Sequence, residues 1–233
     1  WIMTEIKGIS VDEWKKKICE ETERLRPQLI QLSHSIQDEP EIGFQEFKSA
    51  GKICDFLEKQ GFEVTYLDVD EWGSIRLDVL EKAIRKDTIL ISVMYANNEV
   101  GTIQKIAQIG KIAEKNDILF HTDAVQAVGH LPINVKEQNI DMMSASAHKF
   151  HGPKGIGFLY ARKGILLSNI IEGGAQERGK RAGTENIPAI VGMAAALKDV
   201  LAHQKENAEK MTALRDSLIE GLLTIPHSKL NGD

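Results

Sequence analysis

Apolar residues in the first part of the chain recur every three or four positions, which is the spacing of amphipathic helices. One stripe comprises Trp14, Ile18, Leu25, Leu29, Leu32 and Ile36. Within it, Pro27 predicts a kink or a division of the helix, and Pro40 stops it. A second stripe comprises Phe47, Ala50, Cys54 and Leu57. Gly61 follows where a helix commonly ends, so the pattern predicts two helices before residue 62.

From residue 61 onward, short apolar runs alternate with further amphipathic stretches. The runs that predict strands are 62–67, 88–94, 118–122, 142–145 and 156–161. The run 88–94 (TILISVM) is almost continuously apolar, as expected of a strand covered on both faces. Stripes at 77–84 and 106–113 predict helices between the strands. Strands that alternate with helices predict an α/β fold with a mostly parallel sheet.

The end of the chain is predicted to be helical. One apolar stripe comprises Ile190, Met193, Leu197 and Leu201. Another comprises Met211, Leu214, Leu218 and Leu222. Stripes of this kind usually face a protein core, so we expect both to be buried.

The composition indicates the class of protein but identifies no catalytic or binding residue. The 233 residues are 42% hydrophobic, enough for one large domain or two small ones. A net charge of −5 gives no electrostatic reason to expect nucleic acid or an anionic membrane as partner. No apolar run reaches the roughly 20 residues of a membrane span, and the N-terminus lacks the apolar segment of a secretory signal. Two cysteines without a CxxC motif predict a reduced, cytoplasmic protein.

Polar groups follow three of the predicted strands, at the ends where ligands bind in open α/β sheets. These groups are Asn97 to Glu99, Asp123 to Gln126, and Ser146 to Lys149. Each group alone has an ordinary explanation as a turn, a helix cap or solvated surface. Together they match a pyridoxal 5'-phosphate (PLP) site, which needs a lysine for a Schiff base, a carboxylate at the pyridine nitrogen, and donors for the ring oxygen and the phosphate.

The chemistry of the side chains suggests which residue could contact each part of PLP, but it does not decide which lysine forms the Schiff base. Asp123 can supply the carboxylate. The candidates for the ring oxygen and the phosphate are Gln126, Asn98, Ser146 and His148. Two lysines, Lys149 and Lys154, are equally plausible amines on chemical grounds.

The longer strings around these residues resemble one family. They are ILISVMYANNEVGTIQ, FHTDAVQAVGHLPI, DMMSASAHKFHGPKGIGFLY and GGAQERGKRAGTENIPAIVG. In order, spacing and composition they are similar to the cysteine desulfurases, which are fold-type I PLP enzymes of the class V aminotransferase group. The resemblance implies that residues 64–233 form part of a PLP-binding large domain, with a mostly parallel sheet and flanking helices.

The resemblance also implies a role for each candidate residue. Lys149 matches the Schiff-base lysine, in preference to Lys154, and Lys149 and His148 are the expected catalytic residues. The implied cofactor-binding residues are Asn98, Asp123, Gln126, Ser146, His148, Lys149 and Thr184. Thr184 would reach the phosphate of the neighbouring subunit in a homodimer. Its alternative is an N-cap ahead of the helix expected from residue 187 to 201.

The activity implied by the resemblance is removal of sulfur from L-cysteine, which gives alanine and an enzyme persulfide. The sulfur would pass to an acceptor protein for iron–sulfur cluster assembly or thiolation. The persulfide-forming cysteine of the family belongs to a part that this chain does not match, so neither Cys19 nor Cys54 is expected to be the nucleophile. Cys54 lies on an apolar stripe and is expected to be buried and inert. The alternative is a folded remnant or fusion that at most binds PLP.

Residues 1–63 resemble a different family. The stretch RLRPQLIQLSHSIQDEPEIGFQEFKSAGKICDFLEKQGFEV is similar to the opening helices of zinc-dependent amidohydrolases of the aminoacylase type, mainly through Pro40 to Phe44. No metal site is expected, because His34 has no second histidine or carboxylate beside it. A helical segment in front of a truncated PLP domain predicts unpaired sheet edges, and hence dimerisation or marginal stability.

Overall fold

The computed structural model describes residues 5–6, 9–39, 47–168 and 171–231. The chain divides into two compact units. The first unit comprises residues 1–66 and 164–185, and the second comprises residues 67–163 and 186–233.

The first unit is built on two long helices, as the apolar stripes predict. Its elements are β1 (Glu5–Ile6), β2 (Ile9–Ser10), α1 (Val11–Gln37), α2 (Phe47–Lys59) and α5 (Gln176–Gly179). Helix α1 continues past Pro27, so the proline does not divide it. Gly61 ends α2 as predicted: its φ is +85°, its N–H donates to Glu58 O, and the next N–H donates to Leu57 O. Pro40 to Phe44 lie outside the described residues.

The strand predicted for residues 62–67 is wrong. Residues 62–68 have no regular secondary structure, and Phe62 and Tyr66 are exposed. The only pairing nearby among the described residues is the isolated bridge between Val69 and Ile75. An extended apolar segment becomes a strand only when a neighbour accepts its backbone hydrogen bonds, and no described strand does so here.

The second unit contains a four-stranded sheet whose strands follow the remaining predictions. The strands are β3 (Leu90–Met94), β4 (Leu119–Asp123), β5 (Met142–Ser146) and β6 (Gly157–Ala161). They lie in the order β3-β4-β5-β6; the first two pairs are parallel and β6 is antiparallel to β5. The predicted α/β class is confirmed. Among the described strands, β3 and β6 each pair on one side only.

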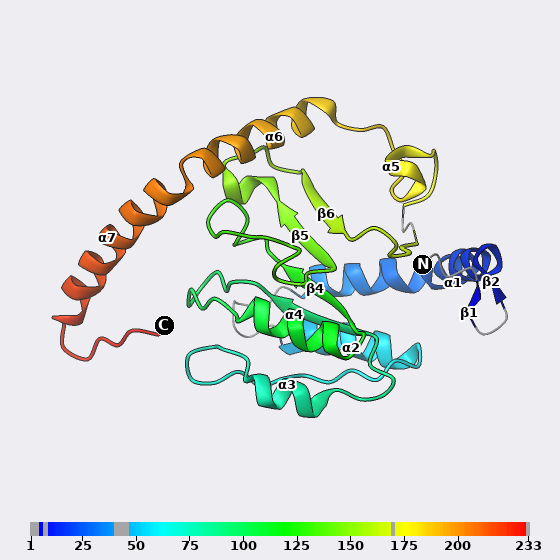
Figure 1. The fold of residues 1–233 in the computed structure, drawn as a ribbon, viewed down its shortest axis with the longest axis horizontal. Coiled ribbons are helices and arrows are strands. Elements are labelled where there is room, and N and C mark those ends of the chain that lie inside the picture. The colour runs from blue at the N-terminus through cyan, green and yellow to red at the C-terminus, as the bar shows by residue number, and fades with distance from the viewer. Residues whose placement is uncertain (1–4, 7–8, 40–46, 169–170, 232–233) are drawn as a thin grey trace. The chain divides into compact units, whose positions relative to one another are not determined.

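Helices of this unit connect the strands and extend beyond them (Figure 1). They are α3 (Leu77–Ala83), α4 (Ile106–Lys115), the 3-10 helix η1 (Ala147–Phe150), α6 (Ile187–Ala202) and α7 (Gln204–Leu223). None of the helices that the structure describes is both long and apolar enough to cross a membrane.

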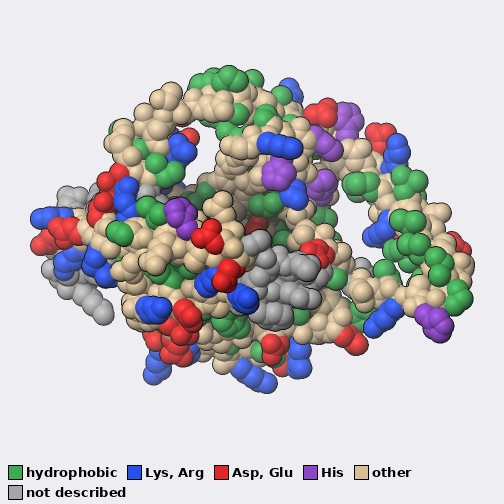
Figure 2. All heavy atoms as spheres, turned by 180° about the vertical axis from the view of Figure 1, so that it is seen from behind, with side chains coloured by type: hydrophobic (Ala, Val, Ile, Leu, Met, Phe, Trp, Pro, Cys, Tyr) green, Lys and Arg blue, Asp and Glu red, His purple; other side chains and the backbone are tan. Residues whose placement is uncertain are grey.

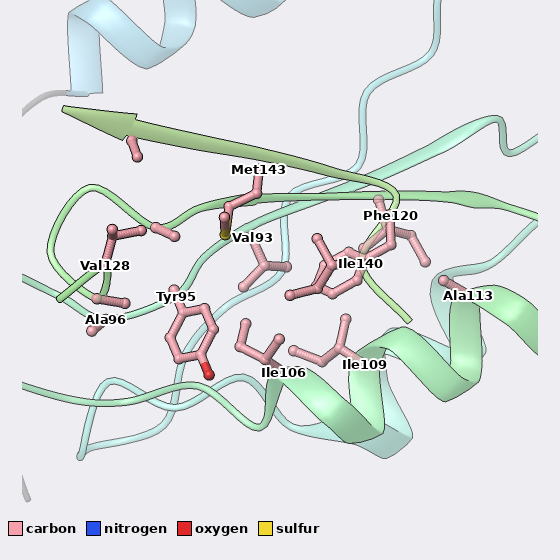
Figure 3. Close-up of a cluster of buried hydrophobic side chains, with 14 of the residues drawn as sticks. Val93, Tyr95, Ala96, Ile106, Ile109, Ala113, Phe120, Val128, Ile140 and Met143 are labelled. Atoms are coloured by element: carbon pink, nitrogen blue, oxygen red, sulfur yellow. The ribbon is translucent and has the colours of Figure 1, made fainter. Parts of the chain in front are cut away.

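The core of the second unit lies between α4 and one face of the sheet. Figure 3 shows Ile106 and Ile109 of α4 beneath Val93 of β3 and Phe120 of β4, with Ile140 beside them. Burial alternates along β4, so that Phe120 and its like-facing neighbours are buried while residues on the opposite face are only partly covered. Alternation therefore assigns one face of each strand to the core and leaves the other for polar side chains.

Helix α4 approaches the chain so closely at Gly110 that a methyl group has no room. A Cβ added there would lie 2.0 Å from Gln138 O, whereas one added at Gly221 of α7 would meet nothing within 4 Å. We expect Gly110→Ala to lower the free energy of unfolding by about 1–3 kcal/mol through overpacking. The same change in a helix at Gly221 should raise it by about 0.5–1 kcal/mol, because alanine is the better helix former.

Urea unfolding of the two glycine variants checks this contrast. Effects of the same sign and size would show that the close approach between α4 and Gln138 does not exist in solution.

The apolar stripe of α7 is exposed, so the expectation of core packing is wrong for this helix. Met211, Leu214, Leu218 and Leu222 have exposed fractions between 48% and 64%. Figure 1 shows α7 leading away from the sheet beyond α6, and hydrophobic side chains gather along it in Figure 2. The stripe of α6 meets the core through Met193 and Leu197, which are partly buried, but Leu201 at its end is exposed. Periodicity predicts that a helix has an apolar face, but not that another element covers it.

Candidate functional site

The carboxyl ends of three strands bring the predicted polar groups to one edge of the sheet. Because β3, β4 and β5 are parallel, Met94, Asp123 and Ser144 are neighbours across the strands. Adjacent strands lie about 4.8 Å apart, so Asp123 at the end of β4 is close to the end of β5. Ser146 ends β5 two residues beyond Ser144 and points to the same face.

The turn after β4 orients the carboxylate of Asp123. Its Oδ1 accepts the backbone N–H of Val125 at 3.0 Å, and within the described residues its Oδ2 has no hydrogen-bond partner. The turn is tight, because Ala127 N and Val128 N both donate to Ala124 O. Gln126 is half-buried in this turn and its amide makes no side-chain hydrogen bond to another described residue. One carboxylate oxygen and one amide are therefore available to a ligand.

The 3-10 helix η1 carries the two predicted catalytic residues. His148 is exposed, and its Nδ1 lies 2.8 Å from Ser146 Oγ. Lys149 is half-buried, and no described residue forms a hydrogen bond or ion pair with its amine. His130 Nε2 lies 3.0 Å from the backbone carbonyl oxygen of Lys149, which ties η1 to the turn after β4.

Close packing fixes the backbone that follows Lys149. His151 adopts a left-handed conformation with φ +66°, and Gly152 N donates to Ala147 O at 2.8 Å. A Cβ at Gly152 would lie 2.8 Å from Ala147 Cβ. Helix α6 contacts η1, and a Cβ at its Gly192 would lie 2.8 Å from Pro153 Cγ. These approaches hold the lysine-bearing turn in one conformation.

Asn98 lies at the tip of the loop that follows β3. The loop closes through the bridge between Ala96 and Ile103, and Asn97 Oδ1 accepts the N–H groups of Glu99 and Val100 at 2.9 Å each. Asn98 is exposed and makes no side-chain hydrogen bond to another described residue. It lies at the same edge of the sheet as Asp123.

Two other predicted residues are exposed. Lys154, the alternative amine, is exposed in the loop between η1 and β6. Thr184 is exposed in residues 164–185, which belong to the first unit. The suggested N-cap role of Thr184 is wrong, because Asn186 caps α6 and its side chain accepts the N–H of Ala189 at 3.2 Å. Asparagine is the stronger cap and lies directly before the first helical residue.

Sequence reasoning missed His121, which lies on β4 two residues before Asp123. Its Nδ1 is 2.8 Å from Ser92 Oγ on β3, and its Nε2 is 2.8 Å from Ser144 Oγ on β5. Burial lowers the pKa of His121 below the usual 6.5, and the charge of Asp123 opposes this shift only in part. The signal was available in the sequence, since residues two apart on a strand share a face.

The available groups at this edge fit PLP. The cofactor offers an aldehyde, a pyridine nitrogen, a ring oxygen and a phosphate. Among the described residues, nothing bonds to the amine of Lys149, to Oδ2 of Asp123 or to the amide of Gln126, and Ser146 and His148 pair with each other. Each group of the cofactor thus has a complementary side chain, and among the described residues only Ser146 and His148 use part of their hydrogen-bonding capacity, on each other.

Comparison with known proteins agrees with this chemistry. The Aminotransferase class-V family model matches residues 28–233. Cysteine desulfurase IscS of Methanosarcina thermophila is 59% identical over 179 residues, which cover 77% of this chain and 44% of that protein. A NifS-like protein of known structure has a TM-score of 0.73 at 39% identity, with 87% of this chain and 57% of that chain covered. The structure of SspA in complex with cysteine has a TM-score of 0.62 at 48% identity, covering 66% of this chain and 45% of that chain.

These matches cover most of this chain but only part of each related protein. The chain spans about half the length of the curated relatives it matches. The family match begins at residue 28, inside the segment 1–63, and includes every candidate residue of the site. The fold of the solved relatives confirms the predicted fold class, while the role of each single residue stays a prediction.

Proposed function

Because this chain belongs to the Aminotransferase class-V family, we propose that it binds PLP at the carboxyl edge of β3, β4 and β5 and acts on L-cysteine as a desulfurase. The family is PLP-dependent. One observation carries the proposal: at the carboxyl edge of the parallel strands, the Lys149 amine, Oδ2 of Asp123 and the Gln126 amide form no hydrogen bond to another described residue. The name of the matched relative, cysteine desulfurase, supports the choice of substrate.

Each side chain would hold one part of the cofactor. Asp123 Oδ2 would accept a hydrogen bond from the protonated pyridine nitrogen, while Oδ1 keeps its hydrogen bond from Val125 N. Gln126 and Asn98 would donate to the ring oxygen, and Ser146 and His148 would bind the phosphate. Lys149 would hold the aldehyde through its amine, and the same amine would be placed to accept and return a proton of the substrate. When bound, PLP supplies an electron sink through its protonated ring.

Sulfur removal needs a thiol that accepts the sulfur atom. The carbon–sulfur bond of cysteine breaks, the carbon takes a proton to give alanine, and the accepting thiol becomes a persulfide. Cys54 is the cysteine whose side chain the structure describes, and it is buried. Burial, followed by the charges of Glu58 and Asp55, raises the pKa of its thiol, which is the opposite of what a nucleophile needs. We assign Cys54 no part in the reaction, and the accepting thiol belongs to another part of the assembly or to an acceptor protein.

A homodimer is part of the proposal. Thr184 is exposed and its side chain has no hydrogen-bond partner among the described residues, so it is free to bind the phosphate held by a second copy. Among the described strands, β3 and β6 each have one unpaired edge, and these edges and the exposed face of α7 also favour association over an isolated monomer. Sedimentation analysis that finds a stable monomer would contradict this part.

The resemblance of residues 1–63 to zinc amidohydrolases also remains a proposal. Helices α1 and α2 pack on each other in the first unit, where Arg24 and Gln28 both hydrogen-bond to Gln60 at 2.9 Å. We propose that these residues are a helical module that contributes no group to the PLP site.

The direct test adds PLP to the purified chain and then supplies L-cysteine with a thiol reductant. We expect saturable visible absorbance from lysine-bound PLP, followed by the release of alanine. L-Serine, which has oxygen in place of sulfur, is the matched control and should yield no alanine.

The two measurements separate the parts of the proposal. Absence of a saturable band overturns PLP binding. A band without alanine overturns desulfuration and leaves the second candidate, a protein that binds PLP without transferring sulfur. The buried state of Cys54 is the observation that favours this second candidate.

A further inference from the structure

A chain of hydrogen bonds crosses three strands directly beneath the proposed cofactor site. It runs from Ser92 on β3 through the imidazole of His121 on β4 to Ser144 on β5, with 2.8 Å at each contact. Ser92 and His121 are also register partners in the sheet. Both ring nitrogens of His121 are thus used by neighbouring strands.

The position of this chain links it to the site. His121 is two residues before Asp123, and Ser144 is two residues before Ser146, so each lies on the same strand face as the site residue that follows it. Asp123 and Ser144 are themselves register partners. A shift between β4 and β5 would therefore change the spacing between the carboxylate and the phosphate-binding serine.

We propose that His121 is a positioning residue: by bridging Ser92 and Ser144 it fixes the spacing of Asp123 and Ser146 that PLP requires. This inference rests on the proposed function, because the spacing between Asp123 and Ser146 matters only if PLP binds between them. His121 itself touches neither the reacting atoms nor the cofactor in this scheme.

The protonation state of the His121 ring is compatible with a bridging role. Because burial lowers the pKa of His121, the ring is neutral near pH 7, with one nitrogen donating and the other accepting. A neutral ring places no second positive charge beside Asp123, whose carboxylate is left to the pyridine nitrogen. One serine hydroxyl must then accept and the other must donate, which gives the chain a fixed direction.

The two ring nitrogens allow substitutions that break one contact at a time. In His121→Asn the amide replaces Nδ1 and can still reach Ser92. In His121→Gln the amide extends to the place of Nε2 and can still reach Ser144, the contact nearest Ser146. His121→Phe keeps a planar ring and loses both contacts.

The PLP affinity of these variants, taken from the saturable visible band, is the main measurement. We expect the affinity to fall about tenfold in His121→Phe and in Ser144→Ala, as for the loss of one to two hydrogen bonds of about 1 kcal/mol each. His121→Gln should retain more affinity than His121→Asn. The matched control is Tyr95→Phe, which removes a 2.8 Å bond between Gln138 and a buried side chain in the same unit, and should leave the affinity unchanged.

Two readouts separate structural damage from loss of positioning. Urea unfolding should show comparable destabilisation for Tyr95→Phe and Ser144→Ala, so a fall in PLP affinity confined to the serine variant reports positioning. Equal affinities for wild type, Ser144→Ala and His121→Asn would overturn the proposal even if His121→Phe does not fold.

The state of the ring can be measured without PLP. Nitrogen-15 NMR of the protein before cofactor is added should show His121 neutral and in a single tautomer near pH 7. A ring that exchanges between tautomers would overturn the bridge. Wild type that binds no PLP would overturn the proposed function, while this NMR result still decides whether the bridge exists.

Discussion

Replacing Lys149 by alanine is expected to abolish the visible absorbance that PLP produces with this protein, together with any activity toward L-cysteine. The band arises from a covalent bond to a lysine amine, and Lys149 is the half-buried lysine on the turn that close packing at Gly152 and Gly192 holds in place. Spectra recorded with saturating PLP for wild type and variant measure the effect.

The matched control is Lys154→Ala, which removes the second chemically plausible lysine. Lys154 is exposed and lies five residues further along the same loop. Its variant should retain the band and the wild-type affinity. A band that survives in Lys149→Ala and disappears in Lys154→Ala would reverse the assignment of the two lysines.

Asp123→Asn is expected to weaken PLP binding roughly 10- to 150-fold. The substitution keeps the shape and the Oδ1 acceptor that binds Val125 N, but removes the charge that holds a proton on the pyridine nitrogen. A charge-assisted hydrogen bond contributes about 1.5–3 kcal/mol, which corresponds to that loss of affinity. The dissociation constant from PLP titrations gives the result.

Asp117→Asn provides the same chemical change at the opposite edge of the sheet. Asp117 is exposed, and its φ of +55° is a conformation that asparagine also tolerates. The Asp117→Asn variant should therefore bind PLP with the same affinity as the wild type. Equal affinities for Asp123→Asn and Asp117→Asn would remove Asp123 from the site and, with it, the basis for placing the cofactor at this edge.

Hydrophobic periodicity was sufficient to predict the four strands of the sheet. Residue chemistry was sufficient to select the candidate side chains at its carboxyl edge. The strands β3 to β6 match predicted runs because their apolar residues have a core face to occupy, opposite Ile106 and Ile109 of α4. Parallel strands bring their carboxyl ends together, so the sequence alone places Asp123 and Ser146 near each other. The assignment of Lys149 over Lys154 needed the family resemblance, because local chemistry does not distinguish them.

Other features depend on partners that are remote along the chain. Residues 62–67 have the composition of a strand, but no described strand forms a ladder with them. The stripe of α7 is as regular as that of α6, yet no described element covers it. His121 has its role because Ser92 and Ser144, far from it in sequence, lie on the strands to either side. Local preference follows from short-range sterics and apolar spacing, whereas burial, pairing and hydrogen bonds across strands depend on which segments the folded chain brings side by side.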